Sequence, residues 1–343
     1  MHRWSWIFVA LLCAWSPGID FGFREGRESL PVDDAPGPER CTSCHQPQGK
    51  DWAESRHAAS WTNDVFQAGY IVEPRKFCVN CHAPHPEQGA EIQRNQDWYE
   101  SLGPGSTLPI PERHDEPSAK HGIHCSTCHW RDGEILSSKP VTGAPHPIRV
   151  EPALATAQLC KGCHEFPMPV FRHGDTVFTE TMMQSTWSEW QSWEGASSKD
   201  CLDCHMPEGR HLWHGAHDLQ RLQDAVVVKP VRGGFEVSVH GVGHRVPTGD
   251  LFRNLQLQIQ GNGEWTTIAR FGREFGPKET PEGLIKIETA DTRLLPDETR
   301  FIPLDRRYTR WRLQYHYASP QDEALAWVGV DQLIVTVSEG RFR

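Results

Sequence analysis

Cys41-Thr-Ser-Cys44-His45 opens a pattern that returns as Cys78-Val-Asn-Cys81-His82, Cys125-Ser-Thr-Cys128-His129, Cys160-Lys-Gly-Cys163-His164 and Cys201-Leu-Asp-Cys204-His205. Each copy is a Cys-x-x-Cys pair followed directly by a histidine. This spacing is the covalent attachment signature of c-type haem, in which two thiols bond the porphyrin and the histidine lies under the iron as an axial ligand. Five copies in 343 residues predict five covalent haems.

Structural zinc sites are the main alternative use of Cys-x-x-Cys pairs. They do not require a histidine after every second cysteine, and they combine pairs two at a time, which would leave one of five pairs unmatched. A thioredoxin-like motif would occur once, beside a βαβ pattern. Ten of the 11 cysteines lie in the five motifs, and Cys13 is the remaining one. The cysteine usage therefore favours haem.

The composition limits the partners of this chain. Its hydrophobic share of 37% is low for a globular protein, which suits a core completed by large apolar cofactors. The formal net charge is −10, and haem propionates would make it more negative. This charge argues against nucleic acid or an anionic membrane surface as partner. We expect redox partner proteins, either other cytochromes or a membrane quinol-linked complex.

The N-terminus carries an export signal, predicted for residues 1–17. Met1–Arg3 is basic, and the apolar run Trp4–Trp15 is too short to span a bilayer. An uncleaved anchor is the alternative, because Pro17 follows the cleavage-like Ala14-Trp15-Ser16. We expect a periplasmic or extracellular protein, with no integral membrane span in the mature chain. Residues 18–40, rich in Gly, Pro and charge, are predicted to be a linker.

The remaining chain divides by composition at 222/223. Residues 41–222 hold all five motifs, and we predict an α-helical and irregular multihaem cytochrome domain, with clearer helices at Asp51–Ser60 and Thr179–Ser192. Residues 223–343 lack cysteine and alternate apolar with polar residues between turn signals, which predicts an antiparallel β-sandwich domain. The expected strands are Ala225–Val231, Phe235–His240, Leu255–Gln260, Trp265–Phe271, Leu284–Thr289, Phe301–Leu304, Arg310–Tyr317 and Leu333–Val337.

Three stretches resemble the multihaem cytochromes c related to hydroxylamine oxidoreductase and its tetrahaem electron acceptor. Trp52-Ala-Glu-Ser-Arg-His57 is similar to a W-x-x-S-x-H pattern that follows the first motif in such proteins. Met183-Gln-Ser-Thr-Trp-Ser-Glu-Trp190, with Cys201-Leu-Asp-Cys-His-Met-Pro207, resembles their M-Q-x-T-x-x-E-W … C-x-D-C-H-M-P run. Gly243-His-Arg-Val-Pro-Thr-Gly249 resembles a G-H-x-x-P-T-G element. The resemblance covers most of the chain and is specific for the class, not for one reaction.

The resemblance also implies distal axial ligands, which would complement the proximal histidines His45, His82, His129, His164 and His205. It suggests His57, His146, His211 and His244, the last reaching back from the β domain to one haem. His121, shortly before the third motif, is the fifth choice. His124 would be strained at its own haem but could serve another, and His217 and His173 are reserves. We interpret His85, His114, His240 and His316 as surface or supporting residues.

Electron transfer is the function that five closely spaced haems favour, because an iron closed by two histidines exchanges electrons without binding substrate. The first alternative is a haem enzyme acting on a small nitrogen or sulfur oxyanion at one open iron. The chain lacks a Cys-x-x-Cys-Lys motif and an evident tyrosine cross-link region, which argues against it. The second alternative is a subunit of an extracellular cytochrome filament, built through a heterologous interface. An oligomer is therefore also left open.

Overall fold

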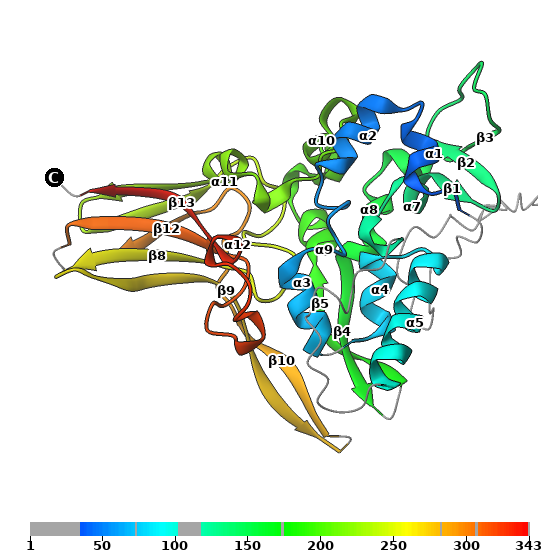
Figure 1. The fold of residues 1–343 in the computed structure, drawn as a ribbon. Helices are drawn as coiled ribbons and strands as arrows, with labels where there is room; N and C mark the ends of the chain where they lie inside the picture. Colours follow the sequence, from blue (N-terminus) through cyan, green and yellow to red (C-terminus); the bar gives the residue numbers. More distant parts are fainter. Residues whose placement is uncertain are drawn as a thin grey trace, which may run out of the picture.

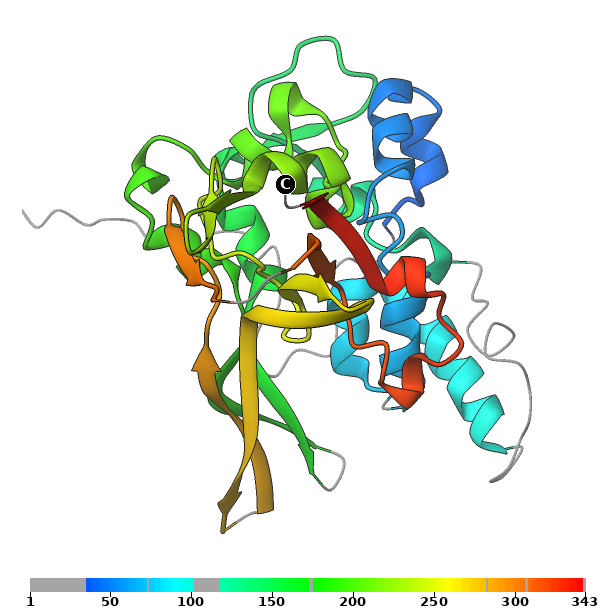
Figure 2. The same cartoon turned by 90° about the vertical axis from the view of Figure 1, so that its left-hand side faces the viewer.

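The computed structural model describes residues 35–341, except 73, 102–117, 173–174, 282 and 306–307. The predicted signal peptide (1–17) and most of the predicted linker (18–40) lie outside these residues. A region of short helices and a region of long strands lie side by side (Figures 1 and 2). Within the described part of the chain, no helix has the length and apolar character needed to cross a bilayer.

The cysteine-bearing region is made mainly of short helices, as its brief helical periods predicted. Short 3-10 turns connect several of them, including η1 (Ala119–His121) and η5 (Gly215–His217). The α-helices are α1 (Pro38–Thr42), α2 (Gln46–Ala53), α3 (Asp64–Val72), α4 (Lys76–His82), α5 (Pro86–Ser101), α7 (Cys125–His129), α8 (Gln158–His164), α9 (Thr186–Gln191), α10 (Cys201–His205) and α11 (Leu219–Ala225).

This region also contains strands that the sequence analysis did not expect. A small sheet joins β1 (Trp130–Arg131), β2 (Glu134–Ser137) and β3 (Ile148–Val150), and a hairpin joins β4 (Glu165–Arg172) to β5 (Asp175–Ser185). The predicted helix Thr179–Ser192 is therefore wrong in its first half, where β5 pairs antiparallel with β4. Cross-strand hydrogen bonding and two β-branched threonines outweigh a helical period that holds only from α9 onward.

The predicted helix Asp51–Ser60 is also misplaced. Helix α2 ends at Ala53, and the chain then passes into tight turns in which Ser55 Oγ accepts a hydrogen bond from Ala58 N at 3.1 Å. A serine side chain that bonds nearby backbone competes with helix continuation, and this explains the early end.

The C-terminal region consists of two antiparallel sheets, and its eight predicted strands are confirmed. One sheet has the order β10-β9-β8-β12-β13 and the other the order β11-β7-β6. Strand β9 is longer than predicted, and with β10 it forms an arm that contacts β5. The strands are β6 (Val226–Val231), β7 (Gly234–Val239), β8 (Asn254–Gly261), β9 (Glu264–Thr280), β10 (Gly283–Asp291), β11 (Thr299–Pro303), β12 (Arg310–His316) and β13 (Ile334–Arg341).

One hydrophobic core lies between these two sheets. Phe235 of the three-stranded sheet and Leu255 and Leu313 of the five-stranded sheet are each 0% exposed in it. Alternation explains this, because every second side chain of a strand points to the same face, and each such buried side chain stabilises the fold by about 1.5–3 kcal/mol. Leu222 of α11 packs against the same core, so the predicted boundary at 222/223 falls inside a helix that belongs structurally with the strands.

A second contact joins the two regions on another side. Ala68 of α3 is buried with Leu325, Val328 and Leu333, which follow β12 in the chain. These contacts hold the β region against α3, which lies between the first and second motifs in the chain. The β region therefore packs directly against the region that holds the candidate haem sites.

Candidate haem-binding sites

The five motifs lie on short helical segments. Four of them are contained within α4, α7, α8 and α10, where one helical turn brings the two cysteines to the same face. The first motif begins in α1 and ends at His45, which directly precedes α2. All ten motif cysteines are free of disulfide bonds. The thiols are therefore available for the thioethers that c-type haem requires.

Helix α10 shows how the local sequence builds a motif. Asp200 precedes the helix and accepts hydrogen bonds from Leu202 N at 2.8 Å and Asp203 N at 3.3 Å, while Asp203 accepts one from Asp200 N at 2.8 Å. This reciprocal capping box satisfies backbone donors that a five-residue helix would leave unpaired. The second oxygen of Asp200 accepts from Ala157 N at 3.1 Å, so it also ties the fifth motif to the start of the fourth.

Cysteines of different motifs contact one another, and these contacts show which of the candidate attachment sites are neighbours in space. The hydrogen bond between Cys41 and Cys125 lowers the pKa of Cys41 to about 7. Thiol contacts join the first motif to the third, the second to the fourth and the fourth to the fifth, through Cys41–Cys125, Cys81–Cys163 and Cys160–Cys201. The order in space therefore differs from the order in the chain.

Four of the five motif histidines face a second imidazole. Because metal–imidazole bonds are about 2 Å long, two imidazoles on one iron should have ring centroids about 6 Å apart. The observed separations match this geometry, so the residues present fit an iron between each pair. The pairs are His45–His146 at 6.5 Å, His164–His57 at 6.4 Å, His129–His211 at 6.4 Å and His205–His244 at 6.3 Å.

Hydrogen bonds orient several of these rings. Nδ1 of His129 lies 3.0 Å from Leu136 O, and Nδ1 of His82 lies 2.8 Å from Ser60 O. The same contact to a backbone carbonyl occurs at His211, where the distance is 2.8 Å. An imidazole that donates from Nδ1 presents Nε2 as the unprotonated ligand atom, so these carbonyls select the tautomer that an iron needs.

Burial keeps the facing imidazoles neutral. It lowers the pKa of His57 to about 3, with smaller contributions from His164 and His205. It also lowers the pKa of His205 to about 4, with His244 as the next cause. Because only a neutral imidazole can bind a metal, this environment favours ligation at ordinary pH.

Two sets of contacts hold His57 and His211 in place. Arg210 donates two hydrogen bonds of 2.8 Å to Asp51 of α2, and His211 N donates to the same carboxylate at 3.2 Å. The Trp213 ring lies 4.7 Å from the His57 ring and 5.0 Å from the His211 ring, centroid to centroid. Trp213 has a φ of 38°, which is strained for a bulky residue. One side chain thus contacts the imidazoles that face two different motifs.

The second motif differs from the other four. In the described part of the chain no second imidazole faces His82, and Phe66 stacks on its ring at 3.6 Å with an interplanar angle of 10°. The carboxylate of Asp250 is close enough to act on the pKa of His82, although burial dominates and lowers that pKa. His114 and His173, which the sequence analysis also considered, lie outside the described residues.

The structure does not bring His121 to a motif histidine. Its Nε2 lies 3.0 Å from a carboxylate oxygen of Glu39, and its ring is 6.5 Å from that of Trp52. Among the described residues no motif histidine faces His121, so its role as the fifth distal ligand stays a prediction. His124 stacks on His85 at 3.8 Å beside the third motif.

Three further histidines have surroundings of other kinds. The ring of His217 stacks on Tyr317 at 4.2 Å. His240 is exposed, and His316 is buried in β12.

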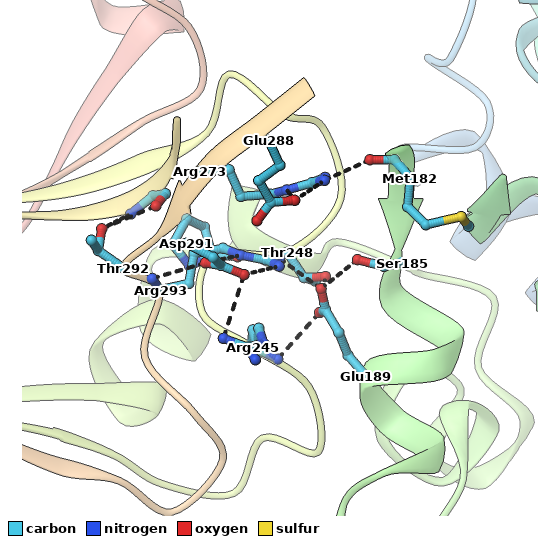
Figure 3. Close-up of polar contacts among 12 residues, drawn as sticks. Met182, Ser185, Glu189, Arg245, Thr248, Arg273, Glu288, Asp291, Thr292 and Arg293 are labelled. Atoms are coloured by element: carbon cyan, nitrogen blue, oxygen red, sulfur yellow. Dashed lines mark hydrogen bonds and ion pairs between the residues drawn. The ribbon is translucent and has the colours of Figure 1, made fainter. Parts of the chain in front are cut away.

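Sequence reasoning gave no role to Glu189, although the residue stands in the quoted Met183–Trp190 stretch. Its buried carboxylate contacts Ser185, Thr248 and Arg293 and so joins α9 to the loop that carries His244 (Figure 3). Nearby, Arg273 of β9 reaches the backbone carbonyl of Met182, and a second link between the two regions results. The sequence did contain a signal, because Glu189 lies in one of the three stretches that resemble the family and Thr248 lies in another.

Comparison with known proteins agrees with this geometry. Residues 40–103, which hold the first two motifs, match the family model for cytochrome c554 and c-prime. A search of the curated proteins finds no match. The motifs and this match define the chain as a multihaem c-type cytochrome.

Among solved structures the chain is similar to a penta-heme cytochrome c552 from Thermochromatium tepidum. The TM-score is 0.60 and the sequence identity 19%, over 90% of this chain and 99% of that chain. At this identity the likeness shows a shared fold, which extends over both the helical and the β regions.

Proposed function

We propose that this chain carries electrons through five covalently bound haems outside the cytoplasm. The observation that carries the proposal is the set of four imidazole pairs with centroids 6.3–6.5 Å apart. Bound haem supplies an iron that alternates between ferric and ferrous states. Two nitrogen ligands leave that iron no site for substrate, so the residues on this chain favour electron exchange over catalysis.

The proposed distal ligands are His146 to the first haem, His211 to the third, His57 to the fourth and His244 to the fifth. In this proposal residues 41–222 hold the haems, and residues 223–343 form a β-sandwich that supplies one ligand across the boundary. The core shared by the two C-terminal sheets supports the sandwich. Glu189 of α9 contacts Arg245 and Thr248 in the loop of the β region, and these contacts support a fixed orientation of the two regions.

The proposed path runs from the first haem to the third and the fourth, with the second and fifth both beside the fourth. The cysteine contacts described above support the first-to-third and the fourth-centred steps. Burial raises the pKa of Cys128 to about 11, and the charge of Cys163 adds to this rise, so the two cysteines are near each other, which supports the link between the third and the fourth motifs. Cys44 is exposed, unlike the other motif cysteines. The first haem would therefore lie nearest the surface and would be the place where a redox partner protein docks.

Spectroscopy and mass measurement test this proposal together. Intact mass should show five covalent haems, and electron paramagnetic resonance of the oxidised protein should show mainly low-spin iron. Stepwise reduction in a potentiometric titration should involve all haems. Fewer than five covalent haems, or a spectrum dominated by high-spin iron, would contradict it.

A second candidate function is small-molecule chemistry at the second haem. It is favoured by one observation, namely that His82 has no facing imidazole in the described part of the chain. An iron with an open position could bind a small nitrogen or sulfur oxyanion. Cyanide added to the oxidised protein should then convert one high-spin signal to low-spin, and nitrite or hydroxylamine should be turned over. A protein that binds no cyanide would rule this candidate out.

A further inference from the structure

Glu189 lies at the centre of the contact between α9 and the loop that carries His244. The residue is 9% exposed, and each carboxylate oxygen has two partners. Oε1 accepts from Ser185 Oγ at 2.7 Å and lies 2.7 Å from an Arg293 guanidinium nitrogen. Oε2 accepts from Thr248 Oγ1 at 2.7 Å and from Arg245 N at 3.3 Å. Figure 3 shows these contacts converging on one carboxylate.

The charges at this junction are balanced within the protein. Arg293 is 5% exposed and is shared between Glu189 and Asp291, which it contacts at 2.8 Å. Arg245 reaches the same Asp291 at 3.4 Å. A buried carboxylate without a partner would be strongly destabilising, and here the Arg293 guanidinium contacts Glu189 directly while the Arg245 guanidinium contacts Asp291.

The backbone of Arg245 connects Glu189 to His244. The Arg245 N–H donates a hydrogen bond to Glu189, and the Arg245 carbonyl oxygen lies 3.0 Å from Nδ1 of His244 and accepts a hydrogen bond from it. One residue is thus held by the carboxylate on one side and holds the imidazole on the other. The two groups belong to different peptide units on either side of the Arg245 Cα, so the link is one of position: the contact with Glu189 fixes the Arg245 backbone, and that backbone fixes the His244 ring.

This arrangement fixes the plane of the ring as well as its tautomer. The His244 ring lies at 11° to the His205 ring. We propose that Glu189 is a positioning residue for His244, and that it sets the ligand field and the reduction potential of the fifth haem by fixing the Arg245 backbone and by its charge. The proposal rests on the His205–His244 pairing in the proposed function. It assigns a redox-tuning role to a residue that touches neither haem nor ligand.

The direction of the effect follows from charge. The Glu189 carboxylate is close enough for its charge to act on His244, and a negative charge near an iron stabilises the more positive ferric state. Glu189→Gln keeps the shape and removes the charge. One of the five midpoint potentials should therefore move to a more positive value, and one low-spin resonance should change its g-values, while the other haems are unaltered.

Glu288→Gln is the matched control. Glu288 also lies at the junction between the two regions and is bonded to Arg273, but its contacts do not reach His244. This variant removes one charge at the junction but leaves the contacts around His244 in place. Its potentials and spectra should stay close to those of the unmodified protein.

The outcomes separate the proposal from its foundation. Unchanged potentials and spectra in Glu189→Gln, with lowered thermal stability alone, would overturn the positioning role. Should Glu189→Gln fail to fold, Thr248→Val removes one hydrogen bond to Oε2 and one to Thr186 Oγ1 and should change the g-values of the same low-spin resonance, whereas no change would overturn the role. An unchanged low-spin spectrum in His244→Ala would instead refute the pairing, and with it this part of the proposed function.

Discussion

The His205 and His244 rings lie almost parallel with their centroids 6.3 Å apart, although one ends helix α10 and the other stands in a loop of the β region. The structure thus brings the last motif histidine to an imidazole from a part of the chain that contains no motif. Formation of the two C-terminal sheets does not by itself bring His244 to His205. The contacts of α11 with the β core and of Glu189 with the 244–248 loop hold the two imidazoles in register.

Replacement of His244 tests this relationship directly. His244→Ala should convert one low-spin haem to high-spin, because removal of the imidazole opens one axial position. Added free imidazole should restore the low-spin signal. Electron paramagnetic resonance of the oxidised protein is the measurement. His240→Ala, at an exposed position, is the control and should leave the spectrum unchanged.

Two histidines outside the motifs should respond differently to the same substitution. His146 faces His45 at 6.5 Å, whereas His121 is paired with Glu39. We therefore expect His146→Ala to produce one high-spin haem and His121→Ala to produce none. Optical spectra of the ferric proteins can make the comparison. High-spin iron in His121→Ala would restore the role that sequence reasoning assigned to that residue.

Trp213 should influence two haems at once. Its ring contacts His57 and His211, which face the fourth and third motifs respectively. Trp213→Ala should shift two low-spin resonances, because both imidazoles lose the surface that limits their rotation. Trp327→Ala is a suitable control, since Trp327 is partly exposed and distant in the chain. A change confined to a single haem would show that Trp213 does not couple the two ligands.

The β region should become less stable in mild acid through His316. Burial, followed by the charges of Arg312 and Arg270, lowers the pKa of His316 from 6.5 to about 4. The unfolded chain therefore binds a proton between these values that the folded chain does not, so stability is full above pH 6.5 and falls as the pH drops toward 4. Between pH 7 and pH 5 the loss should be about 2 kcal/mol.

His316→Gln should reduce this pH dependence, since glutamine does not titrate. Urea unfolding of the haem-loaded protein, followed by far-ultraviolet circular dichroism at both pH values, measures it. His240→Gln, at an exposed site, should retain the full pH dependence. Equal slopes for the His316 variant and the unmodified protein would exclude His316 as the cause.

The parts of the fold that were predictable follow short-range rules. Alternation in segments such as Phe235–His240 located the strands, because a half-buried strand must alternate wherever it lies. The Cys-x-x-Cys-His spacing is also a local pattern, and the attachment sites that it predicts stay a prediction. Thr179–Ser192 failed because its few apolar residues suit a helix or a strand equally, and only the partner strand β4 decides between them.

The pairing of ligands was beyond sequence reasoning. His57 follows the first motif in the chain yet faces His164 of the fourth, and His211 follows the fifth motif yet faces His129 of the third. Such contacts depend on how the helices pack in three dimensions, and sequence distance carries no information about that. Glu189 escaped notice for a similar reason, since its partners Thr248 and Arg293 come from the β region.

The position of His244 near the beginning of the β region also has a consequence for biosynthesis. A chain that ended before Gly241 would possess all five Cys-x-x-Cys-His motifs and every cysteine needed for attachment. It would nevertheless lack the imidazole that faces His205. With His244 as the proposed ligand, the fifth haem would become low-spin only after the C-terminal sheets have formed and packed against α9, so its optical spectrum would report whether this part of the chain has folded.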